Sequence, residues 1–225
     1  SPIITLVAGA LVLLVVGAIT PPWPRGGYAL GTVVTVIVAA TLAWMQWDDA
    51  TTNGPKVIVA GALAFDAFAI FLTIGICAAT LLVALVTDDE LRRSREQGPE
   101  VYALMLVAAT GGVVMAAAND LIVLFLGLET LSLALYVLAA SERKRSASQE
   151  AGLKYFILGG FASAVFLYGI AMIYGGAGST NIGEIVASSQ AGILIGGKDS
   201  IVLAGIARLV VGLGFQGAAG PFHGG

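Results

Sequence analysis

Apolar residues fall into long blocks along the chain, separated by short polar segments. A helix needs about 20 apolar residues to cross a hydrocarbon core of about 30 Å, and the blocks have this length. A smaller helix along the membrane surface is expected in the Gly- and Ser-rich segment after the sixth block. The pattern predicts seven membrane-spanning helices, at residues 3–19, 28–47, 60–87, 101–117, 121–140, 151–174 and 200–222.

Composition places the chain outside the usual range of soluble domains. Hydrophobic residues make up 58% of the 225 residues and charged residues only 11%. The single cysteine, Cys77, lies inside the third block, so the sequence suggests neither an internal disulfide nor a metal cluster. Without a basic patch or a phosphate-binding glycine motif, we expect neither nucleic acid nor NADH to be bound by this chain. The predicted fold class is an all-α integral membrane protein.

Basic residues are distributed unequally between the predicted loops. The second and sixth loops carry Lys56 and Lys198, and the fourth carries none. The first, third and fifth loops carry Arg25, Arg92, Arg93, Arg95, Arg143, Lys144 and Arg145. Because short cytoplasmic loops are rich in Lys and Arg, this bias predicts an N-terminus outside the cell and a cytoplasmic end for the seventh span.

One carboxylate, Glu129, lies near the centre of the fifth predicted span, "LIVLFLGLETLSLALYVLAA". A charged side chain at that depth costs about 2.5 to 3.5 kcal/mol, so it needs a partner, a wet cavity or neutralisation. Ser132 and Tyr136 follow at i+3 and i+7 and share its helical face. This stripe favours a proton or ion pathway, with a structural tie between helices as the alternative.

Lys154 is the expected partner of Glu129, because the fifth and sixth spans are joined by a short loop and should pack as antiparallel neighbours. The lysine lies about one turn inside its span. Two interpretations stay open: coupling to Glu129 through water, or a side chain that extends to the membrane surface.

Three other charged residues lie near or within the spans. Asp120 is predicted to cap the fifth helix. Asp66 is predicted to act as a cap or an interface residue near the start of the third, with a place in a pathway as the alternative. Arg208, roughly eight residues into the seventh span, is expected either to reach lipid headgroups or to pair with an acid.

The seventh span ends in "GFQGAAGPFHGG". Pro221 and the flanking glycines predict a broken helix, and broken helices at membrane depth often border ion pathways. Gln216 adds a polar, non-titrating side chain near this break. His223, the only histidine, is either a proton-pathway residue or an interface residue.

Three quoted stretches carry a family resemblance: "AANDLIVLFLGLETLSLALYVLAA", "SASQEAGLKYFILGGFASAVFLYGIAMIYG" and "VGLGF" followed by "PFH". Together they resemble the antiporter-like membrane subunits of respiratory complex I. The resemblance implies a fold of about fourteen helices containing two inverted five-helix repeats, each with a broken helix. Residues 1–100 would supply three leading helices and 101–225 most of the first repeat, truncated in the broken seventh helix, so we expect a fragment.

The resemblance also implies roles for individual residues. Glu129 matches the family's glutamate on helix five, and Lys154 matches a lysine on helix six. A family lysine on helix seven stands where this chain has Gln216, which cannot titrate.

The implied function is proton translocation in the membrane arm of a bacterial NADH:quinone oxidoreductase in the inner membrane. Other membrane-arm subunits and membrane lipid would be the partners. NADH, FMN, iron–sulfur clusters and quinone would be bound by partner subunits, with no cofactor in this chain. Two alternatives stay open: a subunit of a multisubunit cation/proton antiporter, which would not copurify with flavin and iron–sulfur proteins, and a passive membrane scaffold.

Overall fold

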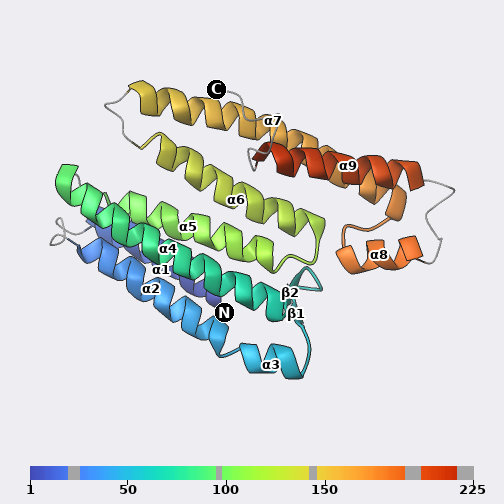
Figure 1. Cartoon of the computed structure of the whole chain (residues 1–225), viewed down its shortest axis with the longest axis horizontal. Helices are drawn as coiled ribbons and strands as arrows, with labels where there is room; N and C mark the ends of the chain where they lie inside the picture. The colour runs from blue at the N-terminus through green and yellow to red at the C-terminus, as the bar shows by residue number, and fades with distance from the viewer. Residues whose placement is uncertain (20–25, 95–97, 142–145, 191–198, 217–225) are drawn as a thin grey trace.

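The computed structural model describes residues 1–19, 26–94, 98–141, 146–190 and 199–216. Most of this chain is helical, and the longer helices lie side by side in one bundle (Figure 1). The helices are α1 (Pro2–Ile19), α2 (Gly27–Trp44), α3 (Trp47–Thr52), α4 (Ala67–Ser94), α5 (Pro99–Ala116), α6 (Leu121–Ala139), α7 (Ser146–Ala177), α8 (Ile182–Gln190) and α9 (Asp199–Gln216). The strands are β1 (Lys56–Ile58) and β2 (Leu63–Phe65).

The membrane spans predicted from the sequence are largely confirmed. Six helices are long and apolar enough to cross a membrane, and α9 is a shorter apolar helix. The small helix expected between the sixth and seventh spans is α8. Part of the seventh predicted span, with Pro221 and the expected break, lies outside the described residues, as does His223.

The start predicted for the third span, residue 60, is wrong. Residues 56–65 form an antiparallel hairpin in which Lys56 pairs with Phe65 and Ile58 with Leu63. Its turn uses left-handed backbone at Val59 and Ala60, with φ of 54° and 53°, followed by Gly61 at 93°. The apolar run "VIVAGALAF" is compatible with a membrane helix and with a buried strand. Composition alone therefore assigned its residues to the helix when they form the hairpin.

Helix α4 begins at Ala67, where Asp66 caps it by accepting a hydrogen bond from the Ala69 backbone N–H at 2.7 Å. The capping role predicted for Asp66 is therefore confirmed. The helix then continues to Ser94, through part of the charged segment that we predicted as a loop. The second span also ends earlier than predicted, at Trp44, and is followed by the separate helix α3.

Three connecting segments meet at one end of the bundle, which we call the hairpin end: the β1–β2 hairpin, residues 117–120, and residues 178–182. Isolated bridges join Leu63 to Ala118 and Asp120 to Asn181. The Asn119 side-chain amide donates to the Gly61 carbonyl at 2.8 Å. The second, fourth and sixth loops therefore lie on the same side, as a multi-pass chain with these spans requires.

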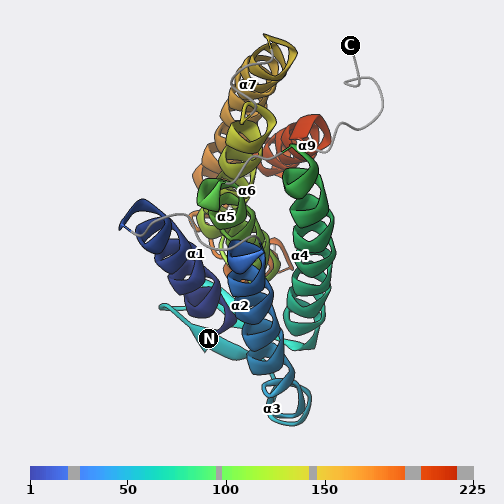
Figure 2. The same ribbon diagram turned by 90° about the vertical axis from the view of Figure 1, so that its left-hand side faces the viewer.

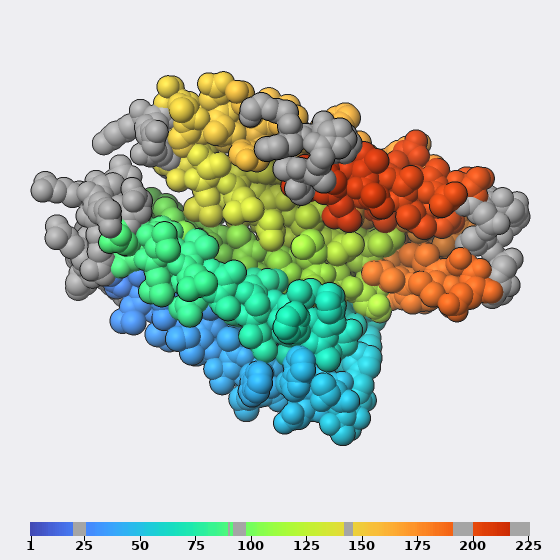
Figure 3. Space-filling model, in the orientation of Figure 1, coloured from blue at the N-terminus to red at the C-terminus, as the bar shows by residue number. Residues whose placement is uncertain are grey.

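Two groups of helices flank a central pair. Figure 2 shows α5 and α6 between the α1, α2 and α4 group and the α7–α9 pair. The first group packs around Leu6, Val36 and Leu106, and the second around Phe166 and Ile173, all with 2% exposure or less. Figure 3 shows α6 between α4 and α9 on one face of the molecule. Large apolar side chains remain exposed on the bundle, among them Phe68 and Val86, as expected for a surface in contact with lipid or other helices.

Candidate functional site

Helix α6 carries the candidate site. Asp120 starts the helix by accepting hydrogen bonds from the Ile122 and Val123 backbone N–H groups at 2.8 and 3.4 Å, which confirms its predicted capping role. Its second carboxylate oxygen accepts from the Thr180 hydroxyl at 2.7 Å, which ties α6 to the segment before α8. The start of α6 is thus fixed from two sides.

Glu129 lies about two turns inside α6 and is partly buried. The Ser163 hydroxyl on α7 donates a hydrogen bond to Glu129 Oε1. Ser163 is itself only 9% exposed. Within the described residues no basic side chain forms an ion pair with Glu129, so its observed polar partner is a hydroxyl rather than a cation.

Ser132 and Tyr136 meet a side chain from α9. The Gln216 side-chain nitrogen Nε2 donates hydrogen bonds to Ser132 Oγ at 2.5 Å and to the Tyr136 hydroxyl at 3.4 Å. Ser132 is 3% exposed. The Gln216 Oε1 atom is buried and has no hydrogen-bond partner in the part of the chain that the structure describes. Gln216 therefore joins α9 to the polar stripe of α6 and leaves one acceptor available.

Gly159 on α7 makes room for Tyr136. A methyl group at Gly159 would lie 1.8 Å from the Tyr136 hydroxyl oxygen, closer than any real contact. The Tyr136 ring also packs edge-on against Phe156, with 6.4 Å between ring centroids. Tyr136 is thus held between α7 and the Gln216 amide.

Lys154 is not in direct contact with Glu129. Its ammonium forms an ion pair with Glu150 on the same helix at 2.8 Å, and the two side chains are 69% and 66% exposed. Lys154 also precedes Ser163, the partner of Glu129, by nine residues, or about 13 Å of helix. The predicted coupling through water stays a prediction, and the observed direct partner of Lys154 is Glu150.

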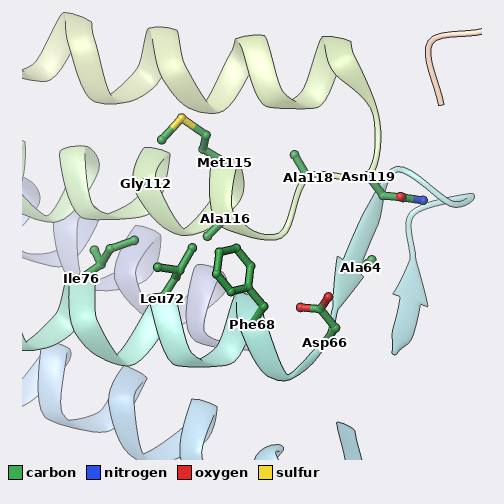
Figure 4. Close-up of a pocket in the computed structure, with 10 residues that line it drawn as sticks. All are labelled: Ala64, Asp66, Phe68, Leu72, Ile76, Gly112, Met115, Ala116, Ala118 and Asn119. Carbon is green, nitrogen blue, oxygen red and sulfur yellow. The ribbon is translucent and has the colours of Figure 1, made fainter. Parts of the chain in front are cut away.

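Asp66 lies apart from this cluster and lines a groove between α4 and α5. Figure 4 shows Asp66 and Asn119 at the hairpin end of the groove, with Phe68, Leu72 and Met115 along it. The lining is mostly apolar. Asp66 caps α4 and Asn119 donates to the Gly61 carbonyl, so among the described residues no hydrogen bond joins either side chain to the polar stripe of α6.

The stripe holds two hydrogen-bonded groups on successive turns of α6: Glu129 with Ser163, and Gln216 with Ser132 and Tyr136. A carboxyl group can hold or release a proton, and a hydroxyl group can donate one hydrogen bond while accepting another. The set therefore has the chemistry of a short proton relay. The sequence predicted all of these residues except Ser163. The sequence signal for Ser163 was weak, because it is simply the one serine in the stretch "GGFASAVFLYG", which is rich in small residues.

Comparison with known proteins gives consistent similarities. Residues 118–224 match a family described as "NADH:quinone oxidoreductase/Mrp antiporter, TM". The chain is 37% identical, over 99% of its length, to proteins named NADH-quinone oxidoreductase subunit N from Gemmatimonas aurantiaca and Myxococcus xanthus. The matched regions cover 43% and 42% of these relatives, so the chain spans less than half of their length.

The fold is also similar to that of a solved structure. A chain of respiratory complex I from Thermus thermophilus, solved with bound aureothin, superposes with a TM-score of 0.78 at 29% identity. The match covers 99% of this chain and 45% of that one.

Proposed function

Because residues 118–224 match the NADH:quinone oxidoreductase/Mrp antiporter transmembrane family, and relatives of 37% identity are named subunit N, we propose that the chain is a proton-translocating membrane-arm subunit of an NADH:quinone oxidoreductase. Quinone reduction elsewhere in the assembly would change the protonation of buried groups in this subunit. The single observation that carries the proposal is that the Glu129 carboxyl group lies inside a membrane span and accepts a hydrogen bond from Ser163.

Glu129 is the proton-holding group in this proposal. Ser163 positions its carboxylate, and Ser132 and Tyr136 continue the polar stripe one and two turns further along α6. Gln216 holds these two hydroxyl groups but cannot carry a proton, so it is a positioning residue. Lys154, at the exposed start of α7, would exchange protons with the stripe through water, and His223 would act beyond Gln216.

Electron transfer belongs to other subunits of the proposed assembly, which would bind NADH, FMN, iron–sulfur clusters and quinone. This chain would contact other membrane-arm subunits and membrane lipid. The hairpin end would face the outside of the cell, because the second, fourth and sixth loops predicted from the sequence carry only two basic residues, Lys56 and Lys198. The division into leading helices up to residue 100 and a repeat from 101 onward is part of the same proposal.

Glu129→Gln tests the role of the carboxyl group, because it preserves the shape of the side chain and removes its titration. Inverted membrane vesicles containing the assembled complex would be assayed for proton pumping and NADH oxidation, with immunodetection of the incorporated subunit. We expect the subunit to be incorporated and the number of protons pumped per NADH oxidised to fall.

Glu184→Gln is the matched control, since it removes an exposed carboxylate on α8 whose hydrogen-bond donor is Ser179 rather than a residue of the polar stripe. It should leave pumping and oxidation unchanged. If the Glu129 variant assembles and pumps as the unaltered protein does, the carboxyl group only ties helices together, and the scaffold interpretation is correct. Copurification without flavin and iron–sulfur proteins would instead favour a cation/proton antiporter.

A further inference from the structure

Arg208 lies within α9, where its charge is not explained by the proposed proton pathway. The guanidinium carbon lies 5.2 Å from the centroid of the Tyr168 ring on α7. One guanidinium nitrogen donates to the Ala204 carbonyl of the preceding turn at 3.3 Å, near the limit of a hydrogen bond. An arginine has five N–H donors, so most of its donors have no partner within the described residues.

The described part of the chain offers no carboxylate to this guanidinium. The ion pair observed among those residues joins Lys154 and Glu150, at the opposite end of α7 from Tyr168. The nearest acid along the chain is Asp199, nine residues before Arg208. Nine residues correspond to two and a half turns, so the two positions lie on opposite sides of α9.

Arg208 lies well inside its helix, where an unpaired charge is unfavourable. Tyr168 lies nine residues, or about 13 Å, before the end of α7 at the hairpin end, and Arg208 lies nine residues after the start of α9. Packing of Gly205 against Ile173 and of Gly212 against Phe166 keeps the antiparallel helices at the same depth. A charged side chain within a membrane span is costly unless it is paired or reaches water.

The surface around Arg208 is apolar and open. Tyr168, Ile201 and Val211 are 58%, 37% and 41% exposed, and Ile201 and Val211 lie seven residues before and three after Arg208 on the same side of α9, so an apolar face of α7 and α9 surrounds the charge. A guanidinium at an apolar interface is best compensated by a carboxylate, which its planar fork binds in a bidentate manner.

We propose that this face of α7 and α9 is an interface for an acid-bearing transmembrane helix from outside these 225 residues, whose Asp or Glu side chain pairs with Arg208. The proposal rests on the chain being part of a larger membrane assembly, but not on proton transfer through Glu129. Charge complementarity defines the occupant: the partner helix is apolar except for one acid at the depth of Tyr168.

A lipid phosphate fits this position less well. The hydrogen bond to Ala204 places the guanidinium about one turn nearer the hairpin end than the Arg208 backbone, yet five residues, or about 7 Å, still separate Ala204 from the start of α9. A phosphate at the level of the helix ends is therefore beyond the roughly 3 Å of a hydrogen bond.

Photo-crosslinking in native membranes tests the identity of the occupant. A benzophenone amino acid at Val211, which is 41% exposed and three residues from Arg208 on a similar face, would be irradiated in the assembled complex. Mass spectrometry should then find an adduct with a transmembrane peptide that carries Asp or Glu within one helical turn of the attachment point. Adducts with lipid alone, or with peptides that carry no acid there, would overturn the proposal.

Charge exchange tests the pairing itself. Arg208→Glu should lower the amount of assembled complex by about tenfold or more, corresponding to about 1.4 kcal/mol, and Arg208→Lys much less. Replacing the crosslinked acid by Arg should restore assembly when combined with Arg208→Glu, and should not support assembly when Arg208 is unaltered. Lys56→Glu, which reverses an exposed charge on β1, is the matched control and should assemble normally. Failure of the exchange to rescue assembly would contradict a direct pair.

Discussion

Close packing of α5 against α6 leads to the sharpest stability prediction, for Gly111→Ala. A methyl group at Gly111 would lie 2.5 Å from the Leu131 backbone nitrogen and 2.6 Å from the Gly127 carbonyl oxygen. Both neighbours are backbone atoms of α6, which no rotamer change can move. Because ordinary contact begins at 3.4 Å, the two helices must separate by about 0.9 Å at this point.

Overpacking of this kind costs about 1 to 3 kcal/mol, and the fixed backbone places Gly111→Ala near the upper end. Alanine also favours a helix over glycine by about 0.5 to 1 kcal/mol, which offsets part of the loss. The free energy of unfolding should therefore fall by about 2 kcal/mol. The measurement is unfolding of the detergent-solubilised protein by added SDS, followed by far-ultraviolet circular dichroism and linear extrapolation.

Gly160→Ala is the matched control, because a methyl group there has no neighbour within 4 Å. It should leave the free energy of unfolding unchanged or raise it slightly through helix propensity. The reasoning is refuted if Gly111→Ala unfolds within about 0.5 kcal/mol of Gly160→Ala, since surface changes with no packing effect fall in that range.

Three further predictions concern single side chains. Gly159→Ala should displace the Tyr136 hydroxyl and lower proton pumping in inverted vesicles, while a normal pumping rate would show that the position of Tyr136 is unimportant. Asp120→Ala should reduce the free energy of unfolding by about 1 to 2 kcal/mol through loss of the helix cap, and Asp120→Asn by less, in the same SDS titration. Lys154→Gln should leave the unfolding midpoint unchanged, because its ion pair with Glu150 is exposed; a clear decrease would indicate a buried partner such as Glu129.

The helices could be predicted because a membrane span has a length requirement that the sequence meets directly. Each predicted span contains a helix, and errors are confined to helix ends. The largest error, at residue 60, arose because a short apolar run does not distinguish a hairpin from the first turns of a helix. The left-handed turn at Val59 and Ala60 has no glycine at those two positions to mark it, and only Gly61 gives a signal.

The candidate site was predictable only along one helix. Helical spacing places Glu129, Ser132 and Tyr136 on one face, and the structure confirms contacts on that face. Partners on other helices depend on how the helices are shifted along one another, which no local pattern reveals. Lys154 consequently forms its observed ion pair with Glu150 four residues away, whereas Ser163, nine residues further on, reaches the carboxylate.

Short polar side chains can meet at α6 only because glycine lets its neighbours approach on both sides. Gly111 and Gly127 bring the α5 and α6 backbones together, and Gly159 receives the Tyr136 hydroxyl from α6. Serine hydroxyls at 132 and 163 extend little beyond the backbone, so a separation of about 1 Å between helices would exceed the tolerance of their hydrogen bonds. Substitution of Gly159 or Gly111 should therefore alter the polar stripe although neither residue has a side chain. A pumping defect in Gly159→Ala with a normal free energy of unfolding would separate this positioning effect from a general loss of packing.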